Sequence, residues 1–481
     1  MTWLTNLLNR LTMYRLILYV LIGYLTLAVV EGFLGVLPLP PVQIALQAVY
    51  LFLVANIANR IFSKIFGAVT NSESATITAL ILSLIVGPVD FPGQLVFLTL
   101  VAIAAMVSKY VLAIRKRHIF NPAALAVTAM AVFGGIGASW WVGSPPLTAF
   151  TAIGGFLILT KIKRFTLAAV FLATYLLGSG FLGVSPIIFF VSVMLIEPLT
   201  SPVETKKQII YAGFVAVVLI LTQQFVKVGY TLEASLLAGN ILFYLLSLPF
   251  RTILTLKTKE KLANNTYAFH FAKTASFDYR PGQFLHWTLP HVGPDARGVR
   301  RYFTIASSPT QKDIMIAVRV PDEASSFKKT LSNLKGGDQI VAMDAAGEFV
   351  LPKDKTIPLA FIAGGIGITP FASMARWLID KKQERDIVLL YSNSTLQDIA
   401  FRKLFDEAQK VGIKTHYVVT EKDGYIDEAL IKTKVPDWKK RIYYVSGPQP
   451  MVDIFAKMLS KMKVAGIKTD FFPGYTDRHQ K

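Results

Sequence analysis

The chain of 481 residues contains no cysteine and only six histidines. The lack of cysteine excludes disulfide bonds, thiolate-ligated iron–sulfur clusters and thiolate-ligated haem within this chain. Only His118 lies near an apolar segment, whereas a transmembrane cytochrome needs several histidines inside its spans to hold stacked haems. Iron-based cofactors are therefore not expected here, and we predict no metal site.

Charged residues are scarce in the first half of the chain. Residues 1–250 form long apolar runs, whereas residues 251–481 carry charge at the density of a soluble protein. Hydrophobic residues make up 53% and the mean hydropathy is +0.49, which is too apolar for an ordinary soluble enzyme. The net charge is +20, but much of it lies in short loops between apolar runs. We therefore expect a lipid bilayer as partner and no nucleic acid.

The apolar half divides into about ten segments that approach the length needed to cross a bilayer. They cover approximately residues 13–35, 42–66, 74–88, 93–114, 120–136, 146–161, 165–182, 184–199, 207–226 and 231–250. Several are short or interrupted by Gly or Pro. This predicts broken or re-entrant helices, which are tolerated where they line a site buried in protein.

The loops between these segments differ in charge. Lys and Arg occur in alternate loops, at Arg10 and Arg15, Arg60 and Lys64, 115–117, Lys161, Lys163 and Arg164, Lys206 and Lys207, and Arg251 and Lys257. The opposite loops are almost free of them, with Lys227 as the exception. With an even number of spans, the positive-inside rule places both termini in the cytoplasm. We predict a multi-pass protein of the cytoplasmic (inner) membrane, whose first apolar run stays as a span rather than being cleaved.

The second half of the chain changes pattern twice. Alternating polar and apolar residues over 251–352 predict a β-barrel, with a strand at 266–271. Residues 353–481 alternate apolar strands with amphipathic helices, which predicts an open parallel α/β sheet. The fold class is thus a polytopic helical membrane domain (1–250) followed by a β-barrel (251–352) and a nucleotide-binding α/β domain (353–481).

Two motifs lie in this second half. The string Arg301-Tyr302-Phe303-Thr304-Ile305-Ala306-Ser307-Ser308-Pro309 follows a Pro281-Gly282-Gln283-Phe284 turn, and Gly364-Gly365-Ile366-Gly367-Ile368-Thr369-Pro370 follows a buried strand. Glycines after a strand let the backbone approach a diphosphate, which the following helix N-terminus also attracts. Aromatic and β-branched residues such as Tyr302 and Thr304 also fill ordinary strands.

Together these motifs resemble those of the ferredoxin–NADP reductase family, which binds FAD and NADH or NADPH. The resemblance implies that Arg301 pairs with the FAD diphosphate, that Phe303 stacks on the isoalloxazine and that Thr304 hydrogen-bonds near flavin N5. It also places Tyr302 and Ser307 in the cofactor site, with Gly364, Gly365, Gly367, Thr369 and Pro370 on the nicotinamide nucleotide.

Three further stretches match this family. Ser325 and Ser326 precede a short helix that would cover the pyrophosphate, although serine at a helix start is also a common plain cap. Ser446-Gly447-Pro448 matches the turn beside the nicotinamide, with Ser446 in place of the usual cysteine. The aromatic tail 471–475 resembles one that packs near the flavin, and a buried anchor is an equally good interpretation. The loop 392–395 has no basic residue until Arg402, which favours NADH over NADPH.

The apolar half resembles another family. Stretches at 76–84, 118–124 and 197–202 are similar to the flavin-bearing membrane subunits of the sodium-pumping NADH:quinone reductase and of the Rnf complex. These are ten-span proteins, and the resemblance implies a second flavin, FMN or riboflavin, near Asn121 and Thr200. The Ser-Gly-Ala-Thr type of motif that carries covalent FMN is absent. Asn121-Pro122 can equally be a helix start, and Thr200-Ser201-Pro202 a helix end.

These observations predict a membrane-bound NAD(P)H-dependent flavin oxidoreductase, with Thr304 and Ser446 as catalytic residues. Electrons would pass from cytosolic NAD(P)H through FAD to a membrane flavin or quinone, and across the bilayer if an extracytoplasmic redox partner receives them. The alternative is a redox-driven Na⁺ or H⁺ pump of the same architecture. A transporter or flavin-binding scaffold with an appended reductase would instead bind NAD(P)H without turnover.

Overall fold

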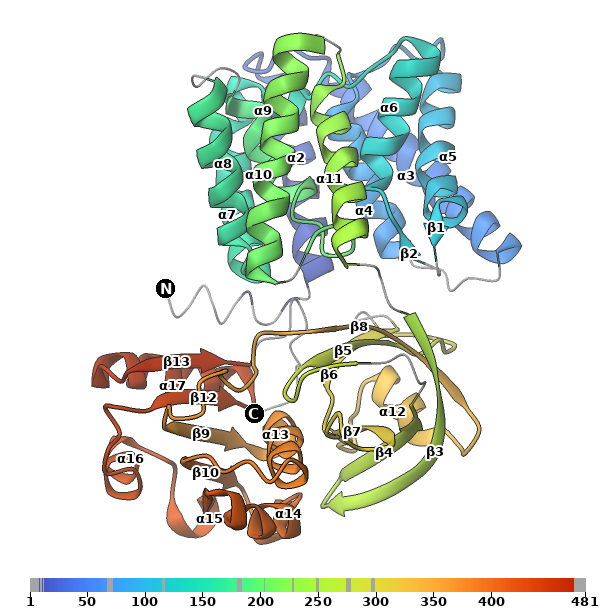
Figure 1. The fold of residues 1–481 in the computed structure, drawn as a ribbon. Coiled ribbons are helices and arrows are strands. Elements are labelled where there is room, and N and C mark those ends of the chain that lie inside the picture. Colours follow the sequence, from blue (N-terminus) through green and yellow to red (C-terminus); the bar gives the residue numbers. More distant parts are fainter. Residues whose placement is uncertain are drawn as a thin grey trace. The chain divides into compact units, whose positions relative to one another are not determined.

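A computed structural model describes residues 8, 11, 13–66, 72–114, 117–179, 184–202, 204–226, 229–247, 251–273, 278–295 and 299–470. The chain divides into two compact units, Met1–Pro249 and Phe250–Lys481, which we call the N-terminal and C-terminal units (Figure 1). The aromatic tail at 471–475 lies outside the described residues. The N-terminal unit is helical, and both β-sheets of the predicted barrel and α/β regions lie in the C-terminal unit.

Each apolar segment predicted from the sequence contains a helix. The helices are α2 (Met13–Phe33), α3 (Pro41–Ile65), α4 (Ser72–Ile85), α5 (Leu95–Val111), α6 (Pro122–Gly134), α7 (Thr148–Ile162), α8 (Phe165–Ser179), α9 (Val184–Phe189), α10 (Thr205–Leu221) and α11 (Thr231–Ser247). Local sequence fixes several ends. Pro41 lies in the first turn of α3, and Gly135 ends α6 in a left-handed conformation with φ of 69°.

Several of these helices are short or irregular, as the Gly and Pro breaks predict. Helix α9 continues as the π-helical turn η3 (Phe190–Met194), and α10 continues as the π-helical turn η4 (Thr222–Val226). Before α7 the chain forms two 3-10 turns, η1 (Trp141–Gly143) and η2 (Pro145–Leu147). A two-stranded hairpin, β1 (Ala113–Ile114) and β2 (Arg117–His118), separates α5 from α6. The unit thus contains short and irregular helices, and the broken or re-entrant helices expected from the sequence stay a prediction.

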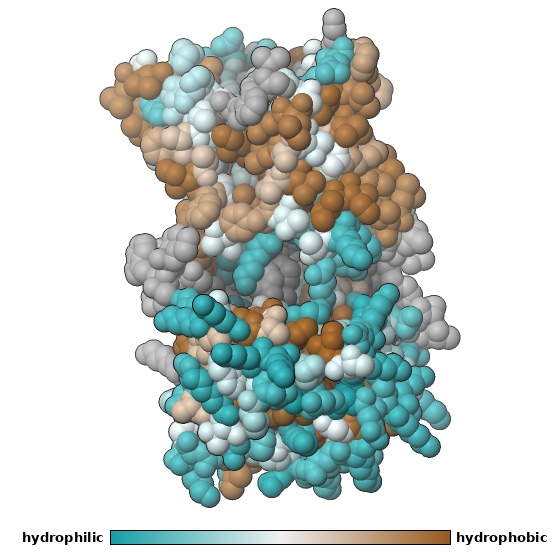
Figure 2. Space-filling view, turned by 60° about the vertical axis from the view of Figure 1, so that its left-hand side comes forward, coloured by the Kyte–Doolittle hydropathy of each residue, from teal (hydrophilic) through white to brown (hydrophobic). Residues whose placement is uncertain are grey.

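Four helical stretches in the described residues are long and apolar enough to cross a membrane. They are Met13–Phe33, Pro41–Ile65, Pro145–Ile162 and Thr205–Val226, which is fewer than the number of spans predicted from the sequence. Other apolar helices are shorter than a hydrocarbon core requires. Large apolar side chains such as Phe133, Leu177 and Phe225 are nevertheless exposed on this unit. Figure 2 shows hydrophobic residues over its visible face and mostly hydrophilic residues over the C-terminal unit.

The C-terminal unit begins with a six-stranded antiparallel sheet. Its strands are β3 (Arg251–Ala263), β4 (Thr266–Ala272), β5 (Phe284–Thr288), β6 (Arg300–Thr304), β7 (Asp313–Arg319) and β8 (Gln339–Ala346), in the order β6-β5-β8-β3-β4-β7. The ends of the sheet approach each other, because the N–H of Ala306 donates to the carbonyl of Met315 at 2.8 Å. Helix α12 (Ser326–Asn333) contributes Phe327 and Leu331 to the same apolar core. The predicted barrel is therefore present, with the FAD-type motif on β6.

A five-stranded parallel sheet follows. It consists of β9 (Leu359–Gly364), β10 (Ile387–Asn393), β11 (Ile413–Val419), β12 (Ile442–Ser446) and β13 (Gly466–Thr469), in the order β11-β10-β9-β12-β13. The helices and 3-10 turns of this region are η5 (Gly365–Ile368), α13 (Thr369–Asp380), η6 (Leu396–Asp398), α14 (Arg402–Glu407), η7 (Ala408–Val411), α15 (Thr420–Asp423), α16 (Glu428–Lys434) and α17 (Gln449–Met462). Two apolar clusters cover the sheet. The chain turns in opposite directions after β9 and β12, and ligands bind at such a switch point in open α/β sheets.

Candidate functional site

The two glycine-rich turns meet at the switch point of the parallel sheet. Gly364 ends β9, and Gly447 follows β12. A Cβ on Gly367 would lie 2.5 Å from the Cα of Gly447 and from the carbonyl oxygen of Ser446, and one on Gly364 would collide with Met451. The first turn therefore requires glycine at position 367, where a Cβ would meet the backbone of the second turn, whereas at Gly364 the Cβ would meet the flexible Met451 side chain. The sequence predicted the turns, and the structure brings them together.

Gly365 has a different role in the first turn. Its φ of 52° is in the left-handed region, and a Cβ there would meet nothing within 4 Å. The backbone therefore has open space on this side, directly before helix α13 begins at Thr369. The hydroxyl of Thr369 bonds to the carbonyl of Ile366 at 3.2 Å, and Pro370 occupies the first turn of the helix. An exposed backbone turn at a helix N-terminus suits a diphosphate.

Ser446 is buried and bonded to an acidic residue. Its hydroxyl donates to Oδ2 of Asp470 at 3.0 Å, and the two residues are 2% and 8% exposed. The N–H of Asp470 donates to the carbonyl of Val445, which fixes Asp470 beside the end of β12. This hydrogen bond orients the Ser446 hydroxyl proton toward Asp470 and leaves the oxygen lone pairs available to another donor.

Strand β6 separates the residues of the FAD-type motif onto two faces. Arg301 pairs with Trp287 and Phe303 with Leu285, two residues of the barrel core, whereas Tyr302 pairs with His286 and Thr304 with Phe284. Neighbouring residues on a strand point to opposite faces. The ring of Tyr302 stacks on His286, with centroids 4.7 Å apart. Tyr302 and Phe303 therefore cannot both stack on the same side of one flavin.

Arg301 lies at the N-terminus of helix α12. Its Nη2 is 3.3 Å from Oδ1 of Asp295, its Nη1 donates to the carbonyl of Arg300 at 2.6 Å, and its Cζ lies 5.3 Å from the centre of the Phe327 ring. Helix α12 also lies on the Phe303 side, because the Phe303 and Phe327 rings are 5.7 Å apart. A guanidinium beside a helix N-terminus is suited to phosphate oxygens. Arg301, Phe303 and α12 thus lie on one side of β6, and the Arg301 guanidinium beside the start of α12 is the part of this group that suits a diphosphate.

The two serines at the start of α12 differ in their bonds. Ser325 is the N-cap, and its side chain accepts a hydrogen bond from the N–H of Lys328 at 3.3 Å, as in the plain-cap interpretation. The hydroxyl oxygen of Ser326 accepts from the N–H of Asp295 at 2.9 Å and lies 3.0 Å from Nε2 of His291. Ser326 is thus the serine that lies within the Arg301–Asp295 group.

Ser307 has a position that its motif does not reveal. Its hydroxyl accepts from the N–H of Met315 at 2.9 Å and bonds to the hydroxyl of Tyr279 at 3.0 Å. Its carbonyl accepts from Ser373 on α13 at 2.6 Å. Burial raises the pKa of Tyr279, so its phenol remains a donor. Ser307 therefore ties the barrel to the first helix of the parallel sheet.

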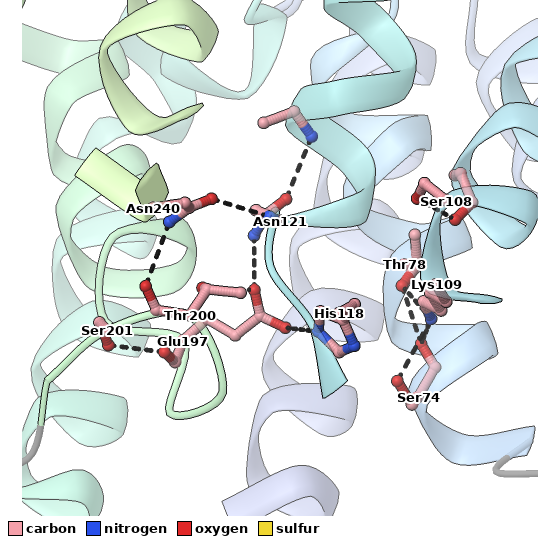
Figure 3. Close-up of polar contacts among 12 residues, drawn as sticks. Ser74, Thr78, Ser108, Lys109, His118, Asn121, Glu197, Thr200, Ser201 and Asn240 are labelled. Carbon is pink, nitrogen blue, oxygen red and sulfur yellow. Dashed lines mark hydrogen bonds and ion pairs between the residues drawn. The ribbon is translucent and has the colours of Figure 1, made fainter. Parts of the chain in front are cut away.

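The residues predicted to hold a second flavin lie in the N-terminal unit, in a closed polar network (Figure 3). Asn121 caps α6 by accepting from the N–H of Ala124 at 3.1 Å, and its Nδ2 donates to Oε2 of Glu197 at 2.9 Å. Thr200 donates to the same oxygen at 3.0 Å. Asn240 accepts from the N–H of Asn121 at 2.8 Å and donates to the carbonyl of Thr200 at 3.1 Å.

This network joins segments that are far apart in the chain. Nε2 of His118 lies 3.6 Å from the second oxygen of Glu197, and Arg164 bonds to Ser201 and to the carbonyl of Pro202. Lys109 bonds to Ser74 and Thr78 on α4 (Figure 3). Asn121 and Thr200 are therefore hydrogen-bonded to other residues of the protein. These bonds hold α6, α11 and the 197–202 turn together. Their bonding does not by itself fit an open flavin site, and flavin binding there stays a prediction.

Several residues of the C-terminal unit were not found from the sequence. Asp470 and Asp295 are bonded to predicted site residues, and Met451 packs on Gly364. The local signal for Asp470 is weak: an acidic residue directly after the short strand β13. Arg402, the first basic residue after the 392–395 loop, lies over the ring of Tyr417, with its Cζ 5.2 Å from the centroid. The preference for NADH stays a prediction.

Comparison with known proteins finds similarities in this half of the chain. Residues 361–457 match the oxidoreductase NAD-binding domain family. The chain is 30% identical over 202 residues to the stachydrine N-demethylase reductase subunit Stc4 of Rhizobium meliloti, covering 39% of this chain and 56% of that protein. It is 30% identical over 181 residues to the NADH oxidoreductase HCR of Escherichia coli, covering 37% of this chain and 54% of that one.

An NADPH oxidoreductase of Mycobacterium tuberculosis is 31% identical over 191 residues, covering 38% of this chain and 50% of that protein. Among solved structures, the Amycolatopsis cytochrome P450 reductase GcoB has a TM-score of 0.42 at 19% identity, covering 48% of this chain and 71% of that one. The chain spans about half the length of the curated relatives it matches.

The fold, the motifs and these relatives agree. Residues 361–457 are similar to an oxidoreductase NAD-binding domain, and the C-terminal unit, which carries the motifs that resemble the ferredoxin–NADP reductase family, is similar to NAD(P)H-dependent reductases. The matches do not bear on the resemblance of residues 10–250 to the flavin-bearing membrane subunits of the sodium-pumping reductase and of the Rnf complex, which stays a prediction.

Proposed function

We propose that the protein is a membrane-bound NAD(P)H-dependent flavin oxidoreductase. Electrons from cytosolic NAD(P)H pass through FAD to a flavin or quinone held by the N-terminal unit. The observation that carries this proposal is the continuity, in one chain, of a flavin reductase domain with a unit that contains four candidate membrane spans. A reductase attached to a bilayer has its nearest acceptors in that bilayer.

Bound FAD would supply the conversion from a two-electron hydride donor to one-electron acceptors. The residues of the chain bind the two cofactors and orient them. Arg301 and the N-terminus of α12 hold the FAD diphosphate, and Gly365 lets the nucleotide approach the backbone before α13. The Ser446 hydroxyl, oriented by Asp470, lies in the turn where the nicotinamide is expected to bind. Thr304, at the end of β6, is 5% exposed and is expected next to flavin N5 by the resemblance, although it lies on the face of β6 opposite to Phe303.

The acceptor inside the N-terminal unit cannot be an iron–sulfur cluster bound by this chain, because the chain has no cysteine. Electrons that cross a hydrocarbon core of about 30 Å need at least one relay within it. The resemblance to flavin-bearing membrane subunits favours a second flavin as relay, with a quinone as the other choice. An extracytoplasmic redox partner would then be the final acceptor.

The first experiment is the flavin content of the full-length protein purified in detergent. Flavins are released by acid and separated into FAD, FMN and riboflavin. FAD together with a second flavin supports a relay in the membrane. FAD alone, at one per chain, contradicts the relay and points to direct quinone reduction.

Variants test whether the network near Glu197 has any part in that flavin. Thr200→Val removes the bond to Glu197, and Thr128→Val is the matched control, because Thr128 bonds to the carbonyl of Ala124 within its own helix. Asn121→Ala has Asn56→Ala as its control, since Asn56 bonds to Phe52 and Thr76. Loss of the second flavin in the Glu197-network variants alone would place the flavin there. Retention in all four variants would place it elsewhere.

The membrane topology has its own test. We propose a multi-pass protein of the cytoplasmic membrane with both termini in the cytoplasm. Because the chain lacks cysteine, single cysteines can be labelled without background. A membrane-impermeant thiol reagent added to intact cells is expected to label Ser139→Cys and not Thr205→Cys. The reverse pattern would contradict this orientation.

A redox-driven pump for Na⁺ or H⁺ remains the second candidate, because of one residue. Glu233 on α11 is 1% exposed, and Trp140 donates to its Oε1 at 2.9 Å. In the described part of the chain its Oε2 has no hydrogen-bond partner. Buried carboxylates within membrane segments commonly carry protons or cations. Turnover that depends on sodium, lost in Glu233→Gln but kept in the control Glu204→Gln, would favour the pump; sodium-independent turnover would oppose a sodium pump.

A further inference from the structure

Asp295 bonds to two groups that the resemblance assigns to the FAD diphosphate, Arg301 and the start of α12. Its Oδ1 lies 3.3 Å from Nη2 of Arg301, and its Oδ2 accepts from the N–H of Ser326 at 3.1 Å. Its own N–H donates to the Ser326 hydroxyl at 2.9 Å. The two carboxylate oxygens thus bond to the guanidinium and to the first N–H of α12.

These two donors are the ones that an anion would use. The first N–H groups of a helix have no partner within the helix, and the helix dipole favours negative charge there. Arg301 adds a charged donor to the same point. The carboxylate is therefore an internal anion, seated on the groups that would bind the FAD diphosphate.

The two partners differ in how firmly they are held. The side chain of Arg301 is 7% exposed, and it is also bonded to the carbonyl of Arg300 and packed over Phe327. The side chain of Asp295 is 29% exposed and follows Gly293 and Pro294 in a loop rather than in a helix or strand. Asp295 is thus the more exposed of the two partners and Arg301 the more deeply packed.

We propose that Asp295 is an internal competitor of FAD: it holds the diphosphate-binding groups in the flavin-free protein and must leave them when FAD binds. Asp295 thereby lowers the apparent affinity for FAD. FAD binds only those molecules in which Asp295 has left Arg301 and α12, so the affinity falls in proportion to their fraction. It also stabilises the flavin-free protein, since it neutralises a buried guanidinium. This inference rests on the FAD diphosphate lying at Arg301.

The proposal has a signature that an ordinary structural residue lacks. Replacing a residue that only shapes the loop lowers both stability and cofactor affinity. Replacing a competitor lowers the stability of the flavin-free protein and raises the affinity for FAD. The two effects therefore have opposite signs.

The test uses Asp295→Asn in the full-length protein, purified in detergent and stripped of flavin. FAD is titrated by the quenching of its fluorescence, and the thermal midpoint is measured without FAD. We expect a dissociation constant about tenfold lower than that of the unchanged protein, together with a lower midpoint. Asp295→Ala provides a second variant with the same expected signs.

Asp338→Asn is the matched control. Asp338 accepts an N–H bond from Lys335 in a turn of the same unit, outside the group of Arg301, Asp295 and Ser326. It is expected to leave FAD affinity unchanged. Unchanged or weaker FAD binding in both Asp295 variants would overturn the proposal. Normal FAD binding by Arg301→Ala would instead remove its premise, that the diphosphate lies at Arg301.

Discussion

The hydroxyl of Ser446 and the carboxylate of Asp470 form a buried hydrogen bond of 3.0 Å, although 24 positions of sequence separate the two residues. Ser446 ends β12 and Asp470 directly follows β13, and these strands are parallel neighbours. The pairing brings the two side chains to the carboxyl edge of the sheet, at the turn where the nicotinamide is expected. The acid thereby determines which way the serine hydroxyl points.

Ser446→Ala is expected to slow the reduction of FAD by NAD(P)H about fivefold, which corresponds to one lost hydrogen bond of about 1 kcal/mol. Asp470→Asn should have a similar effect, and the double variant should be no worse than either, because both remove the same arrangement. Anaerobic stopped-flow measurement of flavin bleaching checks this. Ser460→Ala on the exposed side of α17 is the control. Additive losses would show that the two residues act separately.

The two aromatic residues of the β6 motif should differ in their effect on FAD. Phe303→Ala is expected to weaken FAD binding by about tenfold, since a lost aromatic contact is worth about 1–1.5 kcal/mol. Tyr302→Ala removes a ring that stacks on His286 on the opposite face, and it should leave FAD affinity nearly unchanged. Equilibrium titration of the flavin-free protein measures both. A larger loss for Tyr302 would place the flavin on the other face of the strand.

Gly367→Ala is expected to weaken NAD(P)H binding while leaving FAD bound. The new Cβ would lie 2.5 Å from the backbone of Ser446 and Gly447, so the two turns must move apart. Such a shift costs about 1–3 kcal/mol, which raises KM by about tenfold or more. In Gly466→Ala the Cβ would only touch Ile442 at 3.6 Å, and normal KM is expected. Equal KM in both variants would argue against the contact between the turns.

Protonation of His416 on β11 is expected to lower the stability of the C-terminal unit at acidic pH. Desolvation, with Lys434 as the smaller cause, holds the pKa of His416 below its usual value. The folded state thus binds fewer protons than the unfolded state near the usual value of about 6.5. The stability contribution is complete above that pH and is lost as the pH falls through the lowered pKa. The thermal midpoint should fall less between pH 7 and pH 5 in His416→Gln; an identical fall would refute this role.

Much of the C-terminal unit follows from local sequence. The period-2 pattern placed the strand at Thr266, and the motif beginning at Arg301 was correctly predicted to lie on a strand. The glycines at the end of the strand that contains Phe361 predicted the turn into α13, because a glycine-rich turn between a strand and a helix is typical of nucleotide-binding α/β domains. In the N-terminal unit, apolar runs located the helices because each run is a continuous local signal. The number that spans the membrane depends on helix length, and fewer qualify than the runs suggested.

The contacts that define the sites were decided by tertiary structure. Asn121 meets Glu197 across 76 positions and Asn240 across 119, so no local pattern could reveal that it bonds to protein groups. The bond of Asp295 to Ser326 and that of Ser446 to Asp470 likewise depend on how strands and helices pair. Sequence by itself determined which chemical groups the protein has and which local elements carry them. Only the folded chain decided which groups face each other, because a side chain's partner is set by packing between segments that are distant in sequence.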